Sequence, residues 1–439
     1  AYCYFEWLQL YGDVIITKKP LDVTDPEMKV ARNDRSEVVD FMIQDLKDAA
    51  GQLPLTSAVE NGRVGSEGAW AFLSRVALYE GTWQKFRGNE ARGKELLDVA
   101  AKAAKEVINS KNFSLYTPAI LGDSAQKYMF ILEDVKSNPA GLLKASNTEY
   151  IFSRRHDETL NPIGKNITKE CLANAQQIAQ KFAALYLCQD GLPIEKSSLY
   201  LFKVDGIIAH EYQNRDNRML YTLCVSGGYW SNETSRVNWT SDAADKASAS
   251  IKGYSPANGS GYANQKWAAE RKVQTNSEGY DYPVIRYAEV LLNYAEAVYE
   301  RDDAISDDDL NISLNLVRNR INKSMPKLSN NLVTANGLNM REEIRRERTV
   351  ELFNEGFRID DLKRWKTAET EMPKDFLGIK WTGTEYATKW PNVSYAKNSD
   401  GYIILETGRK WESKHYLYPL PTDQLQLNPN LKQNPGWGE

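Results

Sequence analysis

The chain has 439 residues, more than a single hydrophobic core usually organises, so two or more packed layers or lobes are expected. Its 55 basic and 59 acidic residues are interspersed and leave a formal net charge of -4, which excludes the basic surface of a nucleic-acid-binding protein. The four cysteines form no C-x-x-C pair, which argues against a disulfide scaffold, and no apolar run of about 18 residues marks a membrane span.

Helical periodicity dominates the first 112 residues. Residues 1–11 form an apolar pattern in which we expect Cys3 to pack as a small hydrophobe. Three further helices are predicted over 36–53, 66–86 and 91–110, where apolar residues recur at helical spacing. These helices are long, follow one another through short loops and carry small residues at contact positions. This arrangement favours stacked helix hairpins of tetratricopeptide type, each of which buries its apolar face against the next.

The pattern changes over residues 113–281, where helical periodicity weakens and Gly, Ser, Asn and aromatic residues become more frequent. One clear helix is predicted over 168–187. A loop-rich region of this length in a compact chain is commonly either functional or disordered, and its aromatic content argues against disorder. We therefore expect an irregular lobe inserted between two helical parts.

The helical pattern resumes at Pro283 and carries one narrow polar stripe on an otherwise apolar helix. The stripe consists of Arg286, Glu289, Asn293, Glu296 and Glu300. So few polar positions predict a helix that is buried on most sides.

Asp307, Asp308 and Asp309 precede a helix predicted over 310–321. The calcium-loop pattern of an EF-hand is missing, so we interpret these acids as offsetting the positive end of the helix dipole. After Trp365 the chain is expected to be irregular up to a Pro-rich end that straps over the helices.

The densest charge lies in 340–365, MREEIRRERTVELFNEGFRIDDLKRW. Its apolar residues are scattered around the helical wheel, so the helix must pack on several sides and bury some of its Arg and Glu. Buried charges persist only when they are paired. We interpret the cluster as a structural ion-pair network rather than a catalytic or anion-binding site, with Glu342–Arg346 as one pair and Gly356 as the helix stop.

No catalytic or cofactor motif stands out. The three histidines are isolated, and the zinc spacing H-E-x-x-H and the P-loop pattern are both missing. The sequence therefore predicts a protein that is not an enzyme and holds neither metal nor cofactor. A helical glycosidase stays open as an alternative, because its two carboxylates are defined by their separation in space.

Sugar binding needs flat aromatic faces together with polar side chains for the hydroxyl groups. The segment 229–267 offers both. The candidate ligand-binding residues are Tyr229, Trp230, Asn232, Arg236, Trp239, Tyr254 and Tyr262. Trp267, next to the returning helix, is expected to pack in the core instead.

Three segments resemble the SusD/RagB family, whose members are surface lipoproteins of Bacteroidetes that capture glycans for a TonB-dependent outer-membrane transporter. They are the 340–365 segment, YPVIRYAEVLLNYAEA at 282–297 and YLYPLPTDQLQLNPNLKQNPGW at 416–437, and they follow the family's order. Asp423 and Trp437 stand near positions where the family has Glu and Tyr. The resemblance extends over nearly the whole chain.

The resemblance implies a mainly α, SusD-like fold with three parts: helical 1–112, a loop-rich ligand-binding lobe over 113–281, and helical 282–439 with the closing tail. It implies non-catalytic binding of an oligo- or polysaccharide at the extracellular face of the outer membrane. Delivery to a SusC-like transporter, which the protein would cap like a lid, would follow. The alternatives left open are peptide capture of RagB type and a helical scaffold for a protein partner.

The first residues, AYCYFEWLQLYGDV, are similar to a family segment that is preceded by substantial sequence. The chain also starts without the charged and apolar regions of a signal peptide. We therefore expect the secretion signal, the lipidated cysteine that anchors such proteins to the membrane, and the first helices to be absent from this chain.

Overall fold

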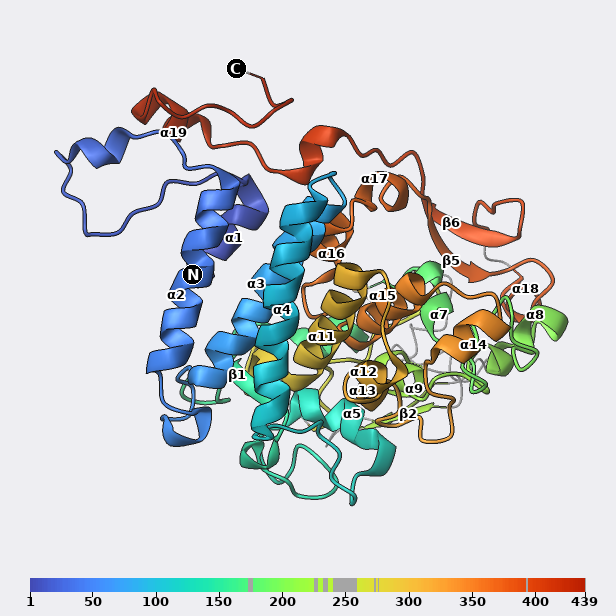
Figure 1. The fold of residues 1–439 in the computed structure, drawn as a ribbon. Helices are drawn as coiled ribbons and strands as arrows, with labels where there is room; N and C mark the ends of the chain where they lie inside the picture. The colour runs from blue at the N-terminus through green and yellow to red at the C-terminus, as the bar shows by residue number, and fades with distance from the viewer. Residues whose placement is uncertain are drawn as a thin grey trace.

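The computed structural model describes the chain apart from residues 173–176, 225–227, 232–235, 240–258, 272–273, 275, 392–393 and 439. The fold is mainly helical, and its long helices lie side by side in Figure 1. None of the described helices is both long enough and apolar enough to cross a membrane.

The four helices predicted at the start of the chain are confirmed, with boundaries shifted by at most one residue. They are α1 (Tyr2–Tyr11), α2 (Arg35–Gln52), α3 (Ser66–Lys85) and α4 (Glu90–Ser110). Helix α3 packs between α2 and α4. Glycines allow the closest approach: a Cβ atom added to Gly93 would lie 2.9 Å from the carbonyl oxygen of Gly81. The expectation for Cys3 is wrong, because it lies on the exposed side of α1.

The predicted helix start at Pro283 is also wrong. Residues Tyr282–Arg286 form strand β4, which pairs antiparallel with β1 (Tyr150–Arg154), and helix α11 begins only at Tyr287 and ends at Asp302. Proline supplies no backbone N–H and is compatible with an edge strand, so the pairing with β1 outweighs the helical pattern here.

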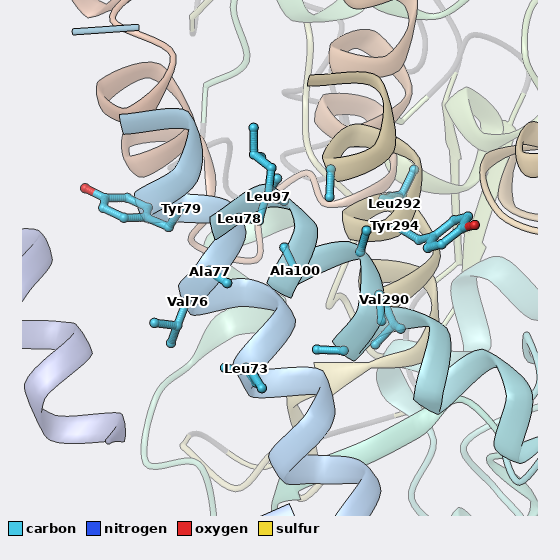
Figure 2. Packing of buried hydrophobic residues seen from close by; sticks show 14 of the residues in the cluster. Leu73, Val76, Ala77, Leu78, Tyr79, Leu97, Ala100, Val290, Leu292 and Tyr294 are labelled. Atoms are coloured by element: carbon cyan, nitrogen blue, oxygen red, sulfur yellow. The ribbon is translucent and has the colours of Figure 1, made fainter. Parts of the chain in front are cut away.

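Helix α11 packs against α3 and α4, although 176 residues separate the end of α4 from its start (110 to 287). One hydrophobic core joins the two helical parts (Figure 2). Its members include Leu73, Val76, Leu97, Ala100, Val290 and Leu292, all of them buried. The stacked-helix architecture expected from the sequence is therefore present, and it is closed by helices from both ends of the chain.

Two predicted helices are interrupted. The helix over 168–187 is replaced by α6 (Ile167–Leu172) and α7 (Gln180–Leu185), and Gln177 between them forms a β-bridge with Ala263. The helix over 310–321 is replaced by α12 (Asp307–Asn311) and α13 (Leu314–Arg318), with non-helical dihedral angles at Ser313. Ser306 caps α12 by accepting from the backbone N–H of Asp309, so the acids do occupy a helix start as expected.

The remaining elements are short. They are α5 (Ala125–Tyr128), α8 (Phe202–Asp205), α9 (Arg218–Thr222), β2 (Gly228–Ser231), β3 (Arg236–Trp239), α14 (Asn330–Ala335), α15 (Met340–Glu351), α16 (Arg358–Arg364), α17 (Ala368–Glu371), β5 (Phe376–Lys380), α18 (Glu385–Lys389), β6 (Tyr402–Glu406) and α19 (Thr422–Leu427). Strands β2 and β3 form one antiparallel pair, and β5 and β6 form another.

The closing tail does act as a strap, but it lies against the loop between α1 and α2 (Figure 1). Asn434 is buried, accepts a hydrogen bond from Arg32 at 3.0 Å and donates to the carbonyl of Tyr11 at 3.0 Å. Asn428 donates to the carbonyl of Val30 at 2.9 Å. The Asn residues of the closing motif therefore hold the two ends of the chain together.

Candidate functional site

The charged segment 340–365 folds into α15, a turn and α16. Helix α15 ends at Glu351, earlier than the predicted stop, and Gly356 lies at the end of the turn with a φ of 90°. Most of the charged side chains on α15 are buried, as the scattered apolar positions predicted. The predicted pair Glu342–Arg346 is replaced by contacts one residue closer: Arg346 binds Glu343 at 3.2 Å and Arg345 lies 3.7 Å from Glu342.

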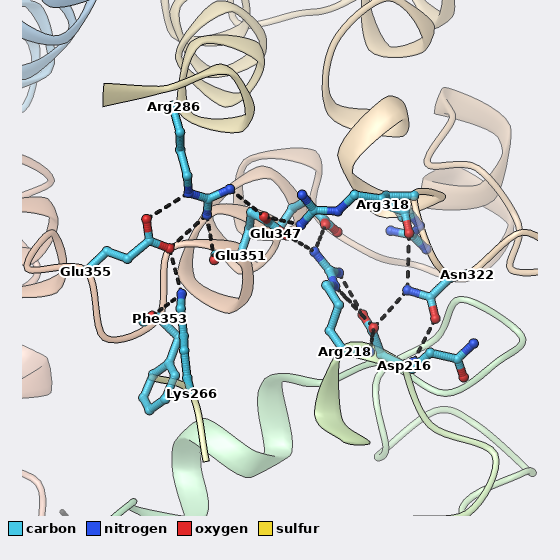
Figure 3. A network of polar contacts seen from close by, with 12 residues as sticks. Asp216, Arg218, Lys266, Arg286, Arg318, Asn322, Glu347, Glu351, Phe353 and Glu355 are labelled. Atoms are coloured by element: carbon cyan, nitrogen blue, oxygen red, sulfur yellow. Dashed lines mark hydrogen bonds and ion pairs between the residues drawn. The ribbon is translucent and has the colours of Figure 1, made fainter. Parts of the chain in front are cut away.

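A buried ion-pair network connects α15 with the rest of the molecule (Figure 3). Glu351 accepts from Arg286 at 2.8 Å, from Arg218 at 3.2 Å, and from Arg320. Glu355 accepts from Arg286 at 2.7 Å. Each of these side chains is 6% exposed or less. The network is closed by opposite charges, which supports the structural interpretation of the arginine-rich cluster.

The electrostatic environment matches this pairing. Burial works against ionisation of Glu351, but the guanidinium groups of Arg320 and Arg286 outweigh it and hold the pKa of its carboxyl well below the ordinary range. Burial lowers the pKa of Lys266 to about 8, although Glu355 accepts a hydrogen bond from its ammonium at 2.6 Å.

The polar stripe of α11 is buried, as predicted, and its members bind partners from separate parts of the chain. Glu289 accepts two hydrogen bonds from Arg75, each at 2.6 Å. Glu296 accepts two bonds from Arg364, and Arg348 donates to Asn293 at 2.8 Å. Arg341 donates to Glu300 at 2.7 Å. This stripe fixes α15 and α16 against the helical scaffold.

Two clefts lie on either side of the turn between α15 and α16. The first, here called the tyrosine cleft, measures about 370 Å³ and lies between α1, α3, β4 and α16. Its walls include Tyr2, Glu6, Arg75, Tyr79, Tyr282 and Asp360. Tyr2 and Tyr282 at this cleft are 50% and 38% exposed. Aromatic faces beside carboxylates and guanidinium groups are the combination that sugar binding requires.

The second, here called the phenylalanine cleft, measures about 590 Å³ and lies between α7, α15 and α16. Its walls include Ile178, Lys181, Phe182, Phe353, Arg358 and Glu371. Phe182 and Phe353 stack with their ring centroids 4.0 Å apart. This cleft is more apolar than the first and suits an apolar side chain with a charged neighbour.

For most of the ligand residues predicted from the sequence, the structure describes the backbone alone or does not describe the residue. Strands β2 and β3 bring Tyr229, Trp230, Arg236 and Trp239 onto one two-stranded ribbon, in which Trp230 pairs with Val237 and Gly228 with Trp239. Asn232 and Tyr254 lie outside the described residues. A role in sugar binding therefore stays a prediction for these six residues.

Tyr262 is described in full. It is 3% exposed, and its hydroxyl donates to the buried Glu211 at 3.1 Å. Its ring is enclosed by the protein, and a ligand role for it also stays a prediction. Trp267 is 6% exposed and packs against Phe130 and Tyr280, which confirms its assignment to the core.

Sequence reasoning missed both clefts. Glu6, Tyr79, Tyr282 and Asp360 come from four elements that only the tertiary fold brings together, and no sequence spacing relates them. Among the described residues, no three His, Cys, Asp or Glu side chains are grouped so that they could hold a metal ion.

Comparisons with known families match both ends of the chain. A family model described as the SusD family matches residues 144–437. A second, described as starch-binding associating with outer membrane, matches residues 1–78. None of the curated proteins matches the chain.

Solved structures show the same fold. A SusD-like protein from Bacteroides fragilis is 22% identical, and the match covers 99% of this chain and 77% of that one with a TM-score of 0.70. A SusD-like carbohydrate-binding protein from the same species is also 22% identical, with coverages of 98% and 77% and a TM-score of 0.71. A third structure, determined with xylogluco-oligosaccharide, is 17% identical, with coverages of 97% and 78% and a TM-score of 0.60.

Proposed function

Because this chain belongs to the SusD family, we propose that it binds an oligo- or polysaccharide at the outer membrane and does not change it chemically. The observation that carries the proposal is the match of the SusD family model to residues 144–437. It is supported by the outer-membrane description of the model that matches residues 1–78, and by the similar structure determined with a xylogluco-oligosaccharide.

The proposal includes the steps that would follow binding. The protein works at the extracellular face, where a lipid anchor holds it to the membrane. It passes the glycan to a SusC-like TonB-dependent transporter. A buried ion-pair network that keeps the scaffold rigid is compatible with a protein that presents a preformed surface to its ligand.

Strands β2 and β3 remain the proposed glycan-contacting ribbon, together with Asn232, Tyr254 and Tyr262. Calorimetric titration against a panel of plant and host polysaccharides tests this. Each stacked aromatic residue contributes on the order of 1 kcal/mol, so Trp230→Ala and Trp239→Ala should each weaken binding about fivefold.

Tyr418→Ala is the matched control for this titration, because Tyr418 is 53% exposed in the closing tail and lines neither cleft. Release of reducing ends is measured in parallel. Binding without release of reducing ends supports the function, and retained affinity in both ribbon variants moves the site elsewhere. If no polysaccharide of the panel gives a heat of binding, glycan binding itself is contradicted.

Peptide capture is the second candidate, and the phenylalanine cleft is the observation that favours it. A stacked phenylalanine pair suits a peptide with an apolar side chain. Lys181 beside it is paired with Glu371, so Arg358 is the cation that would meet an acidic neighbour in the peptide. Titration with a mixture of casein peptides separates the two candidates, because a glycan-binding protein should give no heat with it.

A further inference from the structure

The charged side chains at the floor of the tyrosine cleft are paired with one another or with neighbouring side chains. Arg75 is held by Glu289, and the Asp361 carboxylate accepts from Arg348 at 2.9 Å and from Arg364 at 2.9 Å. These side chains already have their partners within the protein. They form a rigid base and leave ligand recognition to the groups above them.

Two carboxylates above this floor are not engaged. The carboxylates of Glu6 on α1 and Asp360 on α16 line the cleft, and among the described residues neither has a hydrogen-bond donor or an ion-pair partner. The Tyr79 ring leaves α3 on the side away from α11 (Figure 2). Tyr79 is 3% exposed and its hydroxyl is enclosed beside Arg35, so it forms part of the wall of the cleft.

Glu6, Asp360 and Tyr79 lie close enough together for the charge of one to affect the pKa of another. Burial raises the pKa of the Asp360 carboxyl to about 6. The charges of Lys363 and Arg364 act against this rise, and the charges of Asp361 and Glu6 add to it. Burial raises the pKa of the Tyr79 hydroxyl, and the charge of Asp360 adds to this. The charge of one group therefore affects the pKa of the next, although the groups come from three helices.

The charge of the cleft selects the kind of ligand. Four acids and four arginines line it: Glu6, Glu355, Asp360, Asp361, Arg75, Arg154, Arg348 and Arg364. The side chains of Arg75, Arg348, Arg364, Asp361 and Glu355 have partners within the protein, which leaves Glu6 and Asp360 as the carboxylates that face a ligand. Carboxylate acceptors favour a ligand rich in hydroxyl donors. Its volume of about 370 Å³ lies in the range of small-ligand sites.

We propose that the tyrosine cleft binds one neutral sugar ring, whose hydroxyls donate to Glu6 and Asp360 and whose C–H face packs on Tyr2 or Tyr282. This inference rests on the proposed glycan-binding function and adds a site separate from the β2–β3 ribbon. Hydroxyl-to-carboxylate bonds are charge-assisted and stronger than bonds between neutral groups.

The test uses Asp360→Asn and Glu6→Gln, which keep the side-chain shape, with Glu90→Gln on the exposed start of α4 as the matched control. Each variant is titrated with the polysaccharide that the wild-type chain binds best, and with the methyl glycosides of glucose, galactose, mannose and xylose. Asp360→Asn should weaken binding about tenfold, and the control should match the wild type.

The pH dependence adds a readout that a purely structural role would not change. Binding by the wild type should strengthen from pH 5 to pH 7 as Asp360 ionises, and this rise should vanish in Asp360→Asn. The midpoint of thermal unfolding should be the same for Asp360→Asn as for the wild type. Wild-type binding that both cleft variants retain in full overturns the cleft proposal and leaves the function standing. A wild-type chain that binds no saccharide overturns the function, and the cleft proposal with it.

Discussion

At the scale of single residues, Glu351 accepts hydrogen bonds from arginines of three separate segments: Arg218, Arg286 and Arg320. Glu351→Gln should leave these buried guanidinium groups short of one negative charge, which costs about 3–5 kcal/mol of the free energy of unfolding. Urea denaturation at pH 7 measures this. Glu342→Gln is the control, since its side chain is 62% exposed, and should change stability by less than about 0.5 kcal/mol.

The same pair of variants has a defined pH signature. The folded pKa of Glu351 lies below its ordinary value of 4.5, so its contribution to stability is fully present above that pH and is lost as the pH falls. Glu347, whose pKa burial raises, acts in the opposite direction over this range. Between pH 5 and pH 3 the wild type should therefore lose more stability than Glu351→Gln. Equal losses would contradict the assignment.

The sequence indicates that charges in the 340–365 segment are buried, because its apolar residues leave no single exposed face. It does not identify the partners. The spacings i,i+3 and i,i+4 are both neighbours on a helix, and the choice of Glu343 for Arg346 depends on which carboxylate the fold buries: Glu343 is 3% exposed.

At the scale of elements, periodicity predicts the long helices α2, α3 and α4 well, because each has an apolar face long enough to define its phase. It fails where a distant segment decides the structure. Residues 282–286 become a strand because β1, more than a hundred residues earlier, offers its edge. The tyrosine cleft is unpredictable for the same reason, since its walls come from α1, α3, β4 and α16.

The strap is the element whose role is tested most directly. Asn434→Ala removes the acceptor for Arg32 and the donor to the carbonyls of Tyr11 and Tyr418, all at a buried position. Leaving these groups without hydrogen-bond partners should lower the free energy of unfolding by roughly 1–3 kcal/mol. It should also speed proteolytic cleavage in the loop over residues 18–33. Limited trypsin digestion followed by mass spectrometry measures the rate.

Gln426→Ala, an exposed substitution in α19, is the control for the strap and should leave the cleavage rate unchanged. If Asn434→Ala and the control are cut in the 18–33 loop at the same rate, the tail does not restrain that loop.

At the scale of the whole molecule, the helices on either side of the 113–281 segment share one core and one polar stripe. Arg75 on α3 binds Glu289 on α11, and Arg364 on α16 binds Glu296 on the same helix. The sequence divides the chain into three parts because composition changes twice. Composition does not report that the first and third parts pack together, so cooperativity between them is a property of the fold alone.

This arrangement predicts that damage to α4 spreads to α11 and α15. Leu97 on α4 is fully buried in the shared core, and Leu97→Ala should cost about 2–5 kcal/mol through the lost contacts and the cavity left behind. If the two helical parts unfold as one unit, amide hydrogen exchange should accelerate by a similar factor in α4, α11 and α15. Leu427→Ala, at a position that is 65% exposed, should leave exchange in all three helices unchanged. Faster exchange confined to α4 would mean that the first part opens alone, and the ion pairs between α3, α11 and α16 would then not couple the two parts.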